Sequence, residues 1–241
     1  MKIAFLIPIK IGRLDFNSKI YNLLNNFFLN KDDKYNYNFY LGFNHNDKCL
    51  EHKGIFDKFN SENFSVNIKE FSNNIKPGHL TKMWNELFYL SYKGNDYFYQ
   101  LGDDILFDNY NFIDEYIKVL NNMNNIGVTG YLTKNGNNKI LTQSFVSKKH
   151  FEIFGYYFPE TIINWFCDNW INDVYKKFNL SKPLEKKIIN SSDSERYIIT
   201  IDEANYKIDL ERGIKVLDLY ISSKNPNNMK NSSRNIFINN S

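Results

Sequence analysis

Two adjacent carboxylates, Asp103 and Asp104, are the sharpest chemical feature of the 241-residue sequence. They follow a hydrophobic run over 96–101 that is typical of a buried strand, and ligands bind at the carboxyl ends of strands in open α/β sheets. Neighbouring carboxylates repel each other and lose solvation there unless a cation or hydrogen-bond donors compensate. Such oxygen ligands suit Mg²⁺ or Mn²⁺ with diphosphate oxygens, and the alternative is a solvated strand–loop junction.

Asp168 is the second candidate, because it stands among Trp165, Phe166 and Trp170 in a stretch of helical pattern over 163–178. A carboxylate among aromatic side chains is desolvated, which raises its pKa and suits it to act as a general base near neutral pH. The alternative is an exposed position on an amphipathic helix whose other face carries the aromatics.

A third candidate is the segment 76–82, where a Pro-Gly pair precedes a predicted helix and His79 and Lys82 stand nearby. A helix N-terminus with basic side chains can meet an anion such as phosphate, and the alternative is an ordinary turn. The sequence contains no P-loop motif, no dinucleotide-binding glycine motif after its first strand and no His-Glu-x-x-His. P-loop, Rossmann-dehydrogenase and zinc-protease functions therefore lose their main support.

Alternating strand and helix patterns position these residues. Strands are predicted at 2–9, 38–43, 64–71, 96–101, 126–131, 139–146 and 197–201. Helices are predicted at 16–29, about 49–59, 80–92, 112–120, 148–154, 163–178 and 203–221. This order predicts an α/β fold with a mostly parallel sheet flanked by helices. We expect one domain over 1–221, with a polar, flexible tail over 222–241.

Composition narrows the class of protein. A formal net charge of +3 is too small for strong electrostatic binding to nucleic acid. The two cysteines exclude a disulfide framework, and the first apolar run is too short for a signal peptide. No stretch approaches the ~20 apolar residues of a transmembrane segment. We therefore expect a soluble cytoplasmic protein.

Taken together, these segments resemble a GT-A-fold glycosyltransferase over most of the chain. The resemblance rests on the first strand with its Ile7-Pro8-Ile9 ending, on Gly102-Asp103-Asp104 at the place of an Asp-x-Asp motif, and on Asp168 at the start of a later helix. It implies a GT-A-like, Rossmann-like sheet with a nucleotide-binding half over about 1–108 and a smaller acceptor half over about 109–221. Several passages are similar to uncharacterised GT-A-like proteins of protists and large DNA viruses, which suggests a viral source.

The resemblance also implies an activity, the transfer of a sugar from a nucleotide-sugar donor, with UDP-hexose favoured, to a hydroxyl of a glycan or glycoprotein acceptor. Asp103 and Asp104 would hold Mn²⁺ or Mg²⁺, with Asp103 also placed to contact ribose, and Asp168 would be the base of an inverting reaction. The donor and its diphosphate would meet Pro8, Ile9, Arg13, Asp47 and Lys82. Acceptor sugar rings would stack on Tyr157, Trp165 and Trp170.

Two departures from the family pattern leave other functions open. Gly102 stands where the motif often begins with Asp, and Asp168 lies between Cys167 and Asn169 where related enzymes often have two acidic residues. A catalytically inactive relative would keep the fold and bind carbohydrate without consuming a nucleotide sugar. A sugar nucleotidyltransferase would release pyrophosphate, but the segment 9–13 has one glycine where such enzymes usually have a glycine-rich loop.

Overall fold

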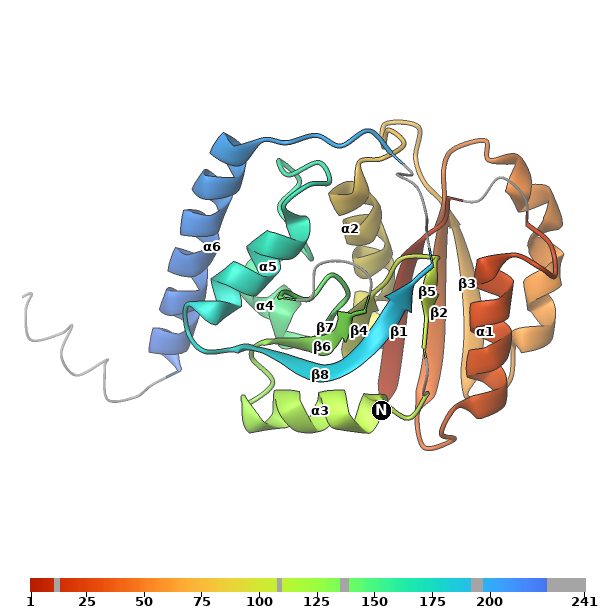
Figure 1. Cartoon of the computed structure of the whole chain (residues 1–241), viewed down its shortest axis with the longest axis horizontal. Coiled ribbons are helices and arrows are strands. Elements are labelled where there is room, and N and C mark those ends of the chain that lie inside the picture. The colour runs from red at the N-terminus through yellow and green to blue at the C-terminus, as the bar shows by residue number, and fades with distance from the viewer. Residues whose placement is uncertain (11–13, 108–109, 135–138, 192–196, 225–241) are drawn as a thin grey trace, which may run out of the picture.

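The protein forms one mixed sheet covered by helices on both faces (Figure 1). The structure is a computed structural model, and it describes residues 1–10, 14–107, 110–134, 139–191 and 197–224. The strand order is β3-β2-β1-β4-β7-β6-β8-β5. The predicted α/β class with a mostly parallel, helix-flanked sheet is therefore confirmed, with antiparallel pairs in the second half.

Four parallel strands make the first half of the sheet: β1 (Lys2–Pro8), β2 (Asn36–Phe43), β3 (Phe64–Glu70) and β4 (Tyr97–Gln100). Beyond β4 the sheet continues through β7 (Ser144–Ser147), β6 (Val128–Thr133), β8 (Ser181–Asn190) and β5 (Ile105–Leu106). β7 is antiparallel to both β4 and β6, so the residues that precede β7 lie at the same edge as those that follow β4.

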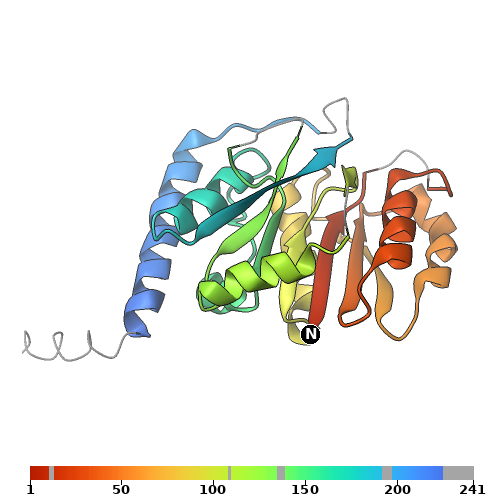
Figure 2. The ribbon, with the colours of Figure 1, turned by 60° about the horizontal axis from the view of Figure 1, so that its bottom comes forward.

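Successive side chains of the central strands pack alternately into two separate hydrophobic cores. Ile3, Phe5 and Ile7 of β1 pack into the first core, and Ala4 and Leu6 pack into the second. The first core is covered by α1 (Lys19–Asn30), the 3₁₀ helix η1 (Lys48–Phe59) and α3 (Ile113–Asn122). Figure 2 shows α1 and α3 on this face of the sheet. Because both faces are buried, β1 reads as a continuous apolar run.

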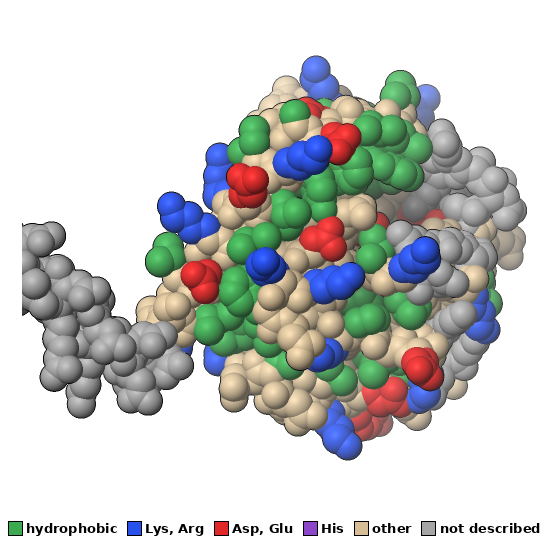
Figure 3. All heavy atoms as spheres, turned by 60° about the vertical axis from the view of Figure 1, so that its left-hand side comes forward, with side chains coloured by type: hydrophobic (Ala, Val, Ile, Leu, Met, Phe, Trp, Pro, Cys, Tyr) green, Lys and Arg blue, Asp and Glu red, His purple; other side chains and the backbone are tan. Residues whose placement is uncertain are grey.

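The second core is covered by α2 (Leu80–Ser91), α4 (Lys149–Phe154), α5 (Cys167–Lys176) and α6 (Glu203–Ser223), and a 3₁₀ turn, η2 (Tyr92–Gly94), follows α2. α6 packs on α5 through Leu217 and Gly213, where a Cβ at position 213 would lie 2.9 Å from Val174 Cγ2. On the side of the molecule that carries α6, charged side chains of both signs are interspersed with hydrophobic ones (Figure 3). None of the helices in the described ranges is long and apolar enough to span a membrane.

Several predicted elements of the second half are corrected. The strand predicted over 139–146 is reduced to β7, the segment 197–201 forms no strand, and the helix predicted from 163 begins at Cys167. β8 was missed because its three Lys and one Glu side chains hide the alternation of a strand, and main-chain pairing with β6 stabilises it instead. α6 extends the predicted last helix to Ser223. The predicted division at 108–109 and residues 225–241 of the predicted tail lie outside the described residues.

Candidate functional site

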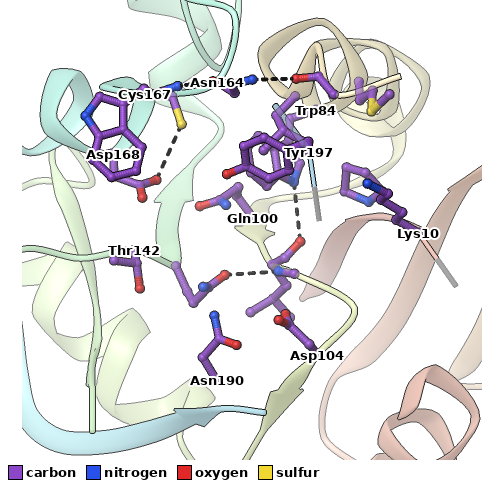
Figure 4. A pocket seen from close by; sticks show the side chains of 18 of the residues that line it. Lys10, Trp84, Gln100, Asp104, Thr142, Asn164, Cys167, Asp168, Asn190 and Tyr197 are labelled. Carbon is purple, nitrogen blue, oxygen red and sulfur yellow. Dashed lines mark hydrogen bonds between the residues drawn. The ribbon is translucent and has the colours of Figure 1, made fainter. Parts of the chain in front are cut away.

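A cavity of about 350 Å³ opens at the carboxyl ends of β1 and β4. Segments from both halves of the chain line it: the residues after β1 and β4, the start of α2, the residues before β7, and the start of α5 with the end of β8 (Figure 4). This is the edge at which an open α/β sheet binds ligands. The polar side chains on its lining include Lys10, Asn44, Gln100, Asp104, Thr142, Gln143, Asn164, Asp168, Asn190 and Tyr197.

The two adjacent carboxylates have different surroundings. Asp104 lines the cavity and is 3% exposed, and its backbone carbonyl accepts hydrogen bonds from the Ser191 N–H at 2.9 Å and the Ser191 hydroxyl at 2.8 Å. Asp103 is not on the cavity lining; its carboxylate accepts the backbone N–H of Lys10 at 2.8 Å. Asp103 thus ties the end of β4 to the end of β1. The predicted contact of Asp103 with metal and ribose stays a prediction, and the Lys10 backbone N–H engages one of its two carboxylate oxygens.

The lining offers one buried carboxylate to a divalent cation. Across the described ranges, no three His, Cys, Asp or Glu side chains gather into a set that could hold a metal ion alone. Asp104 is nevertheless buried on the cavity wall, and Mg²⁺ commonly takes only one or two carboxylates together with substrate phosphates and water. Asp104 could therefore hold such a cation once a diphosphate supplies the remaining oxygens.

Asp168 lies in the first turn of α5, and its carboxylate faces the cavity across from Asp104 in Figure 4. The helix begins after Phe166, whose backbone has a left-handed φ of 74°. Burial raises the pKa of Asp168 to about 7, although the neighbouring Cys167 thiol, which donates at 3.6 Å, acts in the opposite direction. The predicted rise of this pKa is confirmed. At neutral pH the group can accept or release a proton.

Asn164 joins three segments at the rim of the cavity. Its amide nitrogen donates to the carbonyls of Gly78 and Ile198, each at 3.0 Å. Its side-chain oxygen accepts the N–H groups of Trp165 at 2.7 Å and Thr200 at 2.9 Å. One buried side chain therefore holds the turn before α2, the segment before α5 and the segment before α6 in one wall.

Some of the residues predicted to contact the nucleotide line the cavity, and others do not. Pro8 and Ile9 line the cavity, as does Asn44 in the loop after β2. Asp47 lies outside the lining, where it caps η1 by accepting the Cys49 N–H at 2.9 Å. Lys82, on α2, also lies outside the lining, and Arg13 falls outside the described residues.

Of the predicted acceptor residues, only Trp165 is at the cavity, where it is 44% exposed. Trp170 and Tyr157 are 0% exposed, so neither ring can stack on a sugar and both assignments are corrected. The Trp170 indole N–H donates to the Asp209 carbonyl of α6 at 3.0 Å, and the Tyr157 hydroxyl donates to the Ser144 carbonyl at 2.7 Å. Both aromatics are core residues.

Several lining residues were missed in the sequence. Lys10 could have been found, because it follows the end of β1 even more closely than Asp104 follows the end of β4. Gln100 carried a weaker signal as a lone amide at the end of an apolar run. Asn190 and Tyr197 carried no signal in the sequence, because the strand β8 that brings Asn190 to the cavity was not predicted.

No family model matches the sequence, and no curated protein matches it. Among solved structures, S. aureus TarS superposes with a TM-score of 0.58 at 13% identity, covering 81% of this chain and 38% of that chain. TarS 1-349 gives a TM-score of 0.57 at 14% identity over 79% of this chain and 60% of that one. This chain thus spans less than two thirds of either protein.

Glucosyl-3-phosphoglycerate synthase from Mycobacterium tuberculosis, solved with Mn²⁺, UDP-glucose and phosphoglyceric acid, gives a TM-score of 0.54 at 10% identity, covering 80% of this chain and 72% of that one. At these identities the similarity concerns the fold, and the viral source and cytoplasmic location stay predictions. The chain therefore has an α/β fold of the GT-A-like kind that TarS and this synthase share.

Proposed function

We propose that the protein is a glycosyltransferase that takes its sugar from a nucleoside-diphosphate sugar with the help of Mn²⁺ or Mg²⁺. The observation that carries this proposal is the placement of Asp104 and Asp168 on two sides of one cavity at the ligand-binding edge of a GT-A-like sheet. The M. tuberculosis synthase of similar fold was solved with the class of donor and cation that we assign.

On the donor side, Asp104 would hold the cation. A bound divalent ion neutralises the negative charge that builds on a departing diphosphate. Lys10, whose side chain is exposed at the cavity, adds a positive charge, and the N-terminus of α2 adds the positive end of a helix dipole. Pro8, Ile9 and Asn44 would border the nucleotide.

On the acceptor side, Asp168 would take the proton from the attacking hydroxyl. A carboxyl with a pKa of about 7 is partly ionised at neutral pH, so it can receive that proton and return it to water afterwards. Asp168 and Asp104 lie on different sides of the cavity. A base at Asp168 and a diphosphate held at Asp104 would then stand opposite each other, as attack opposite the leaving group requires, so we expect inversion. Trp165 at the rim would stack on an acceptor ring of a glycan or glycoprotein.

Metal-dependent nucleotide binding tests this proposal first. We would measure the melting temperature with UDP, GDP, CDP or dTDP, each with and without Mn²⁺, on the wild type and on Asp104→Asn. A ligand at a hundred times its dissociation constant adds about 2.7 kcal/mol, and we expect this shift to require both Mn²⁺ and Asp104. Asp218→Asn, which removes the same charge from the exposed side of α6, is the control and should behave as the wild type. No shift with any diphosphate would refute the proposal.

Product analysis separates the alternatives. Transfer or hydrolysis of the donor sugar, followed by NMR of the product anomer, would establish the reaction, and a retained anomer would remove Asp168 from its role as base. Glycan binding without metal-dependent loss of a nucleotide sugar would indicate an inactive carbohydrate-binding relative. Release of pyrophosphate from a nucleoside triphosphate would instead identify a nucleotidyltransferase.

A further inference from the structure

The chain contains two glutamines, Gln100 and Gln143, and both line the cavity. They lie 43 positions apart in the sequence, and the antiparallel pairing of β4 with β7 brings them to the same edge of the sheet. Each has its amide oxygen fixed by the protein. Within the described part of the chain, no hydrogen bond engages the amide nitrogen of either.

Gln100 is the last residue of β4 and is 1% exposed. Its Oε1 accepts both the backbone N–H and the hydroxyl of Ser144, each at 3.1 Å, so the amide has one orientation. The Ser144 hydroxyl is itself 3.1 Å from the Tyr157 hydroxyl in the core. This anchoring leaves the two N–H bonds of Nε2 as donors at the cavity.

Gln143 immediately precedes β7 and is 6% exposed. Its Oε1 accepts the Gly102 N–H at 3.1 Å, in the turn that carries Asp104. The segment leading to Gln143 is also fixed, because the Asn172 side chain accepts the Leu141 N–H at 3.1 Å and donates to the Leu141 carbonyl at 2.9 Å. Gln143 therefore also presents a positioned amide nitrogen.

We propose that Gln100 and Gln143 are specificity-determining residues whose amide N–H groups donate to hydroxyl oxygens of the transferred sugar. This rests on the proposed function. In Figure 4 Gln100 lies between Asp168 and Asp104, which is where a sugar must lie if one carboxylate serves the acceptor and the other the diphosphate. Neutral donors suit neutral acceptors, whereas a phosphate is bound more strongly by Lys or Arg.

The consequence is discrimination by hydroxyl groups. A site built to hydrogen-bond a substrate hydroxyl rejects the analogue that lacks it, because its buried polar groups are left unpaired. The donor sugar should therefore carry free hydroxyls at the two positions that face the glutamines, and deoxy sugars at those positions should bind about ten times more weakly or worse.

Gln143→Glu and Gln100→Glu test this without removing the anchoring contacts. In each variant one carboxylate oxygen still accepts the same N–H donors, and the other oxygen replaces an N–H donor with an acceptor. Asn121→Asp, the same amide-to-acid change on the exposed side of α3, is the control. The dissociation constants of UDP, GDP, CDP, dTDP and their hexose conjugates would be measured with Mn²⁺ by calorimetry, after the melting temperature has confirmed folding.

We expect the ratio of the hexose-conjugate constant to the diphosphate constant to rise at least tenfold in both glutamate variants and to stay unchanged in the control. Monodeoxy donors would then identify each hydroxyl, because its removal should weaken binding to the wild type but not to the matching variant. An unchanged ratio in both folded variants overturns the assignment and leaves the proposed function standing. Equal weakening of diphosphate and conjugate overturns it as well. If no diphosphate binds the wild type, both proposals fail.

Discussion

Asp168→Asn should make the protein more stable and less active. Burial raises the pKa of this carboxyl from 3.8 to about 7, so the ionised form is disfavoured in the folded state. Each pKa unit corresponds to 1.36 kcal/mol, which gives about 4 kcal/mol as the upper limit of the cost of burying the charge. Because the carboxyl borders a water-accessible cavity, we expect about 2 kcal/mol of stabilisation at pH 8, or roughly 4–8 °C in the melting temperature.

The effect must depend on pH in one direction. The folded pKa lies above the unfolded one, so the wild-type carboxyl favours folding fully below pH 3.8 and loses this contribution as the pH rises through 7. Asn cannot ionise, so the stability of the variant should exceed that of the wild type at pH 8 and approach it at pH 5. Activity at pH 8 should fall about 10²-fold or more, because the base is gone, and the loss should be smaller at pH 5, where the wild-type carboxyl is mostly protonated.

Urea unfolding of both proteins at pH 5, 6, 7 and 8 measures this difference. Asp173→Asn is a suitable control, because Asp173 lies on the same helix and accepts the Tyr206 hydroxyl at 2.6 Å; it should give no gain at pH 8. A difference between Asp168→Asn and wild type that is absent at pH 8, or equal at pH 5 and pH 8, would refute the reasoning.

Three further changes probe the frame around the site. Burial lowers the pKa of His150 to about 4. The free energy of unfolding should therefore fall by about 3 kcal/mol as the pH drops from 6.5 to 4. In urea unfolding at several pH values, the stability of His150→Gln should fall less over the same range. Asn164→Ala strands four hydrogen-bond partners and should cost about 2–4 kcal/mol by denaturant unfolding; an unchanged midpoint would contradict its role. Gly213→Ala brings a Cβ within 2.9 Å of Val174 and should lower stability by about 1–3 kcal/mol, measured by thermal unfolding.

Much of the fold could be predicted from local sequence. β1 is apolar along nearly its whole length because both of its faces are buried, and this short run ending at Pro8 is typical of a central strand. Asp104 could be placed at the ligand-binding edge because it follows the buried strand β4. Asp168 could be assigned a raised pKa because aromatic residues surround it in sequence, and desolvation depends on near neighbours.

Tertiary structure decided which of several equivalent residues reach the cavity. Asp103 and Asp104 are adjacent and chemically identical, yet the turn after β4 directs one to the Lys10 backbone and places the other on the cavity wall. Trp165 and Trp170 are five residues apart, and packing against α4, the segment after it and α6 buries the second one.

The two glutamines show the limit of the sequence most clearly. Their residue type is visible in the chain, but these two residues, 43 positions apart, meet only through the antiparallel pairing of β4 with β7. The orientation of each amide depends on a backbone or hydroxyl donor from the other segment. Local sequence determines which side chains a strand end can offer, whereas long-range pairing determines which of them face the same cavity and which atom of each points into it.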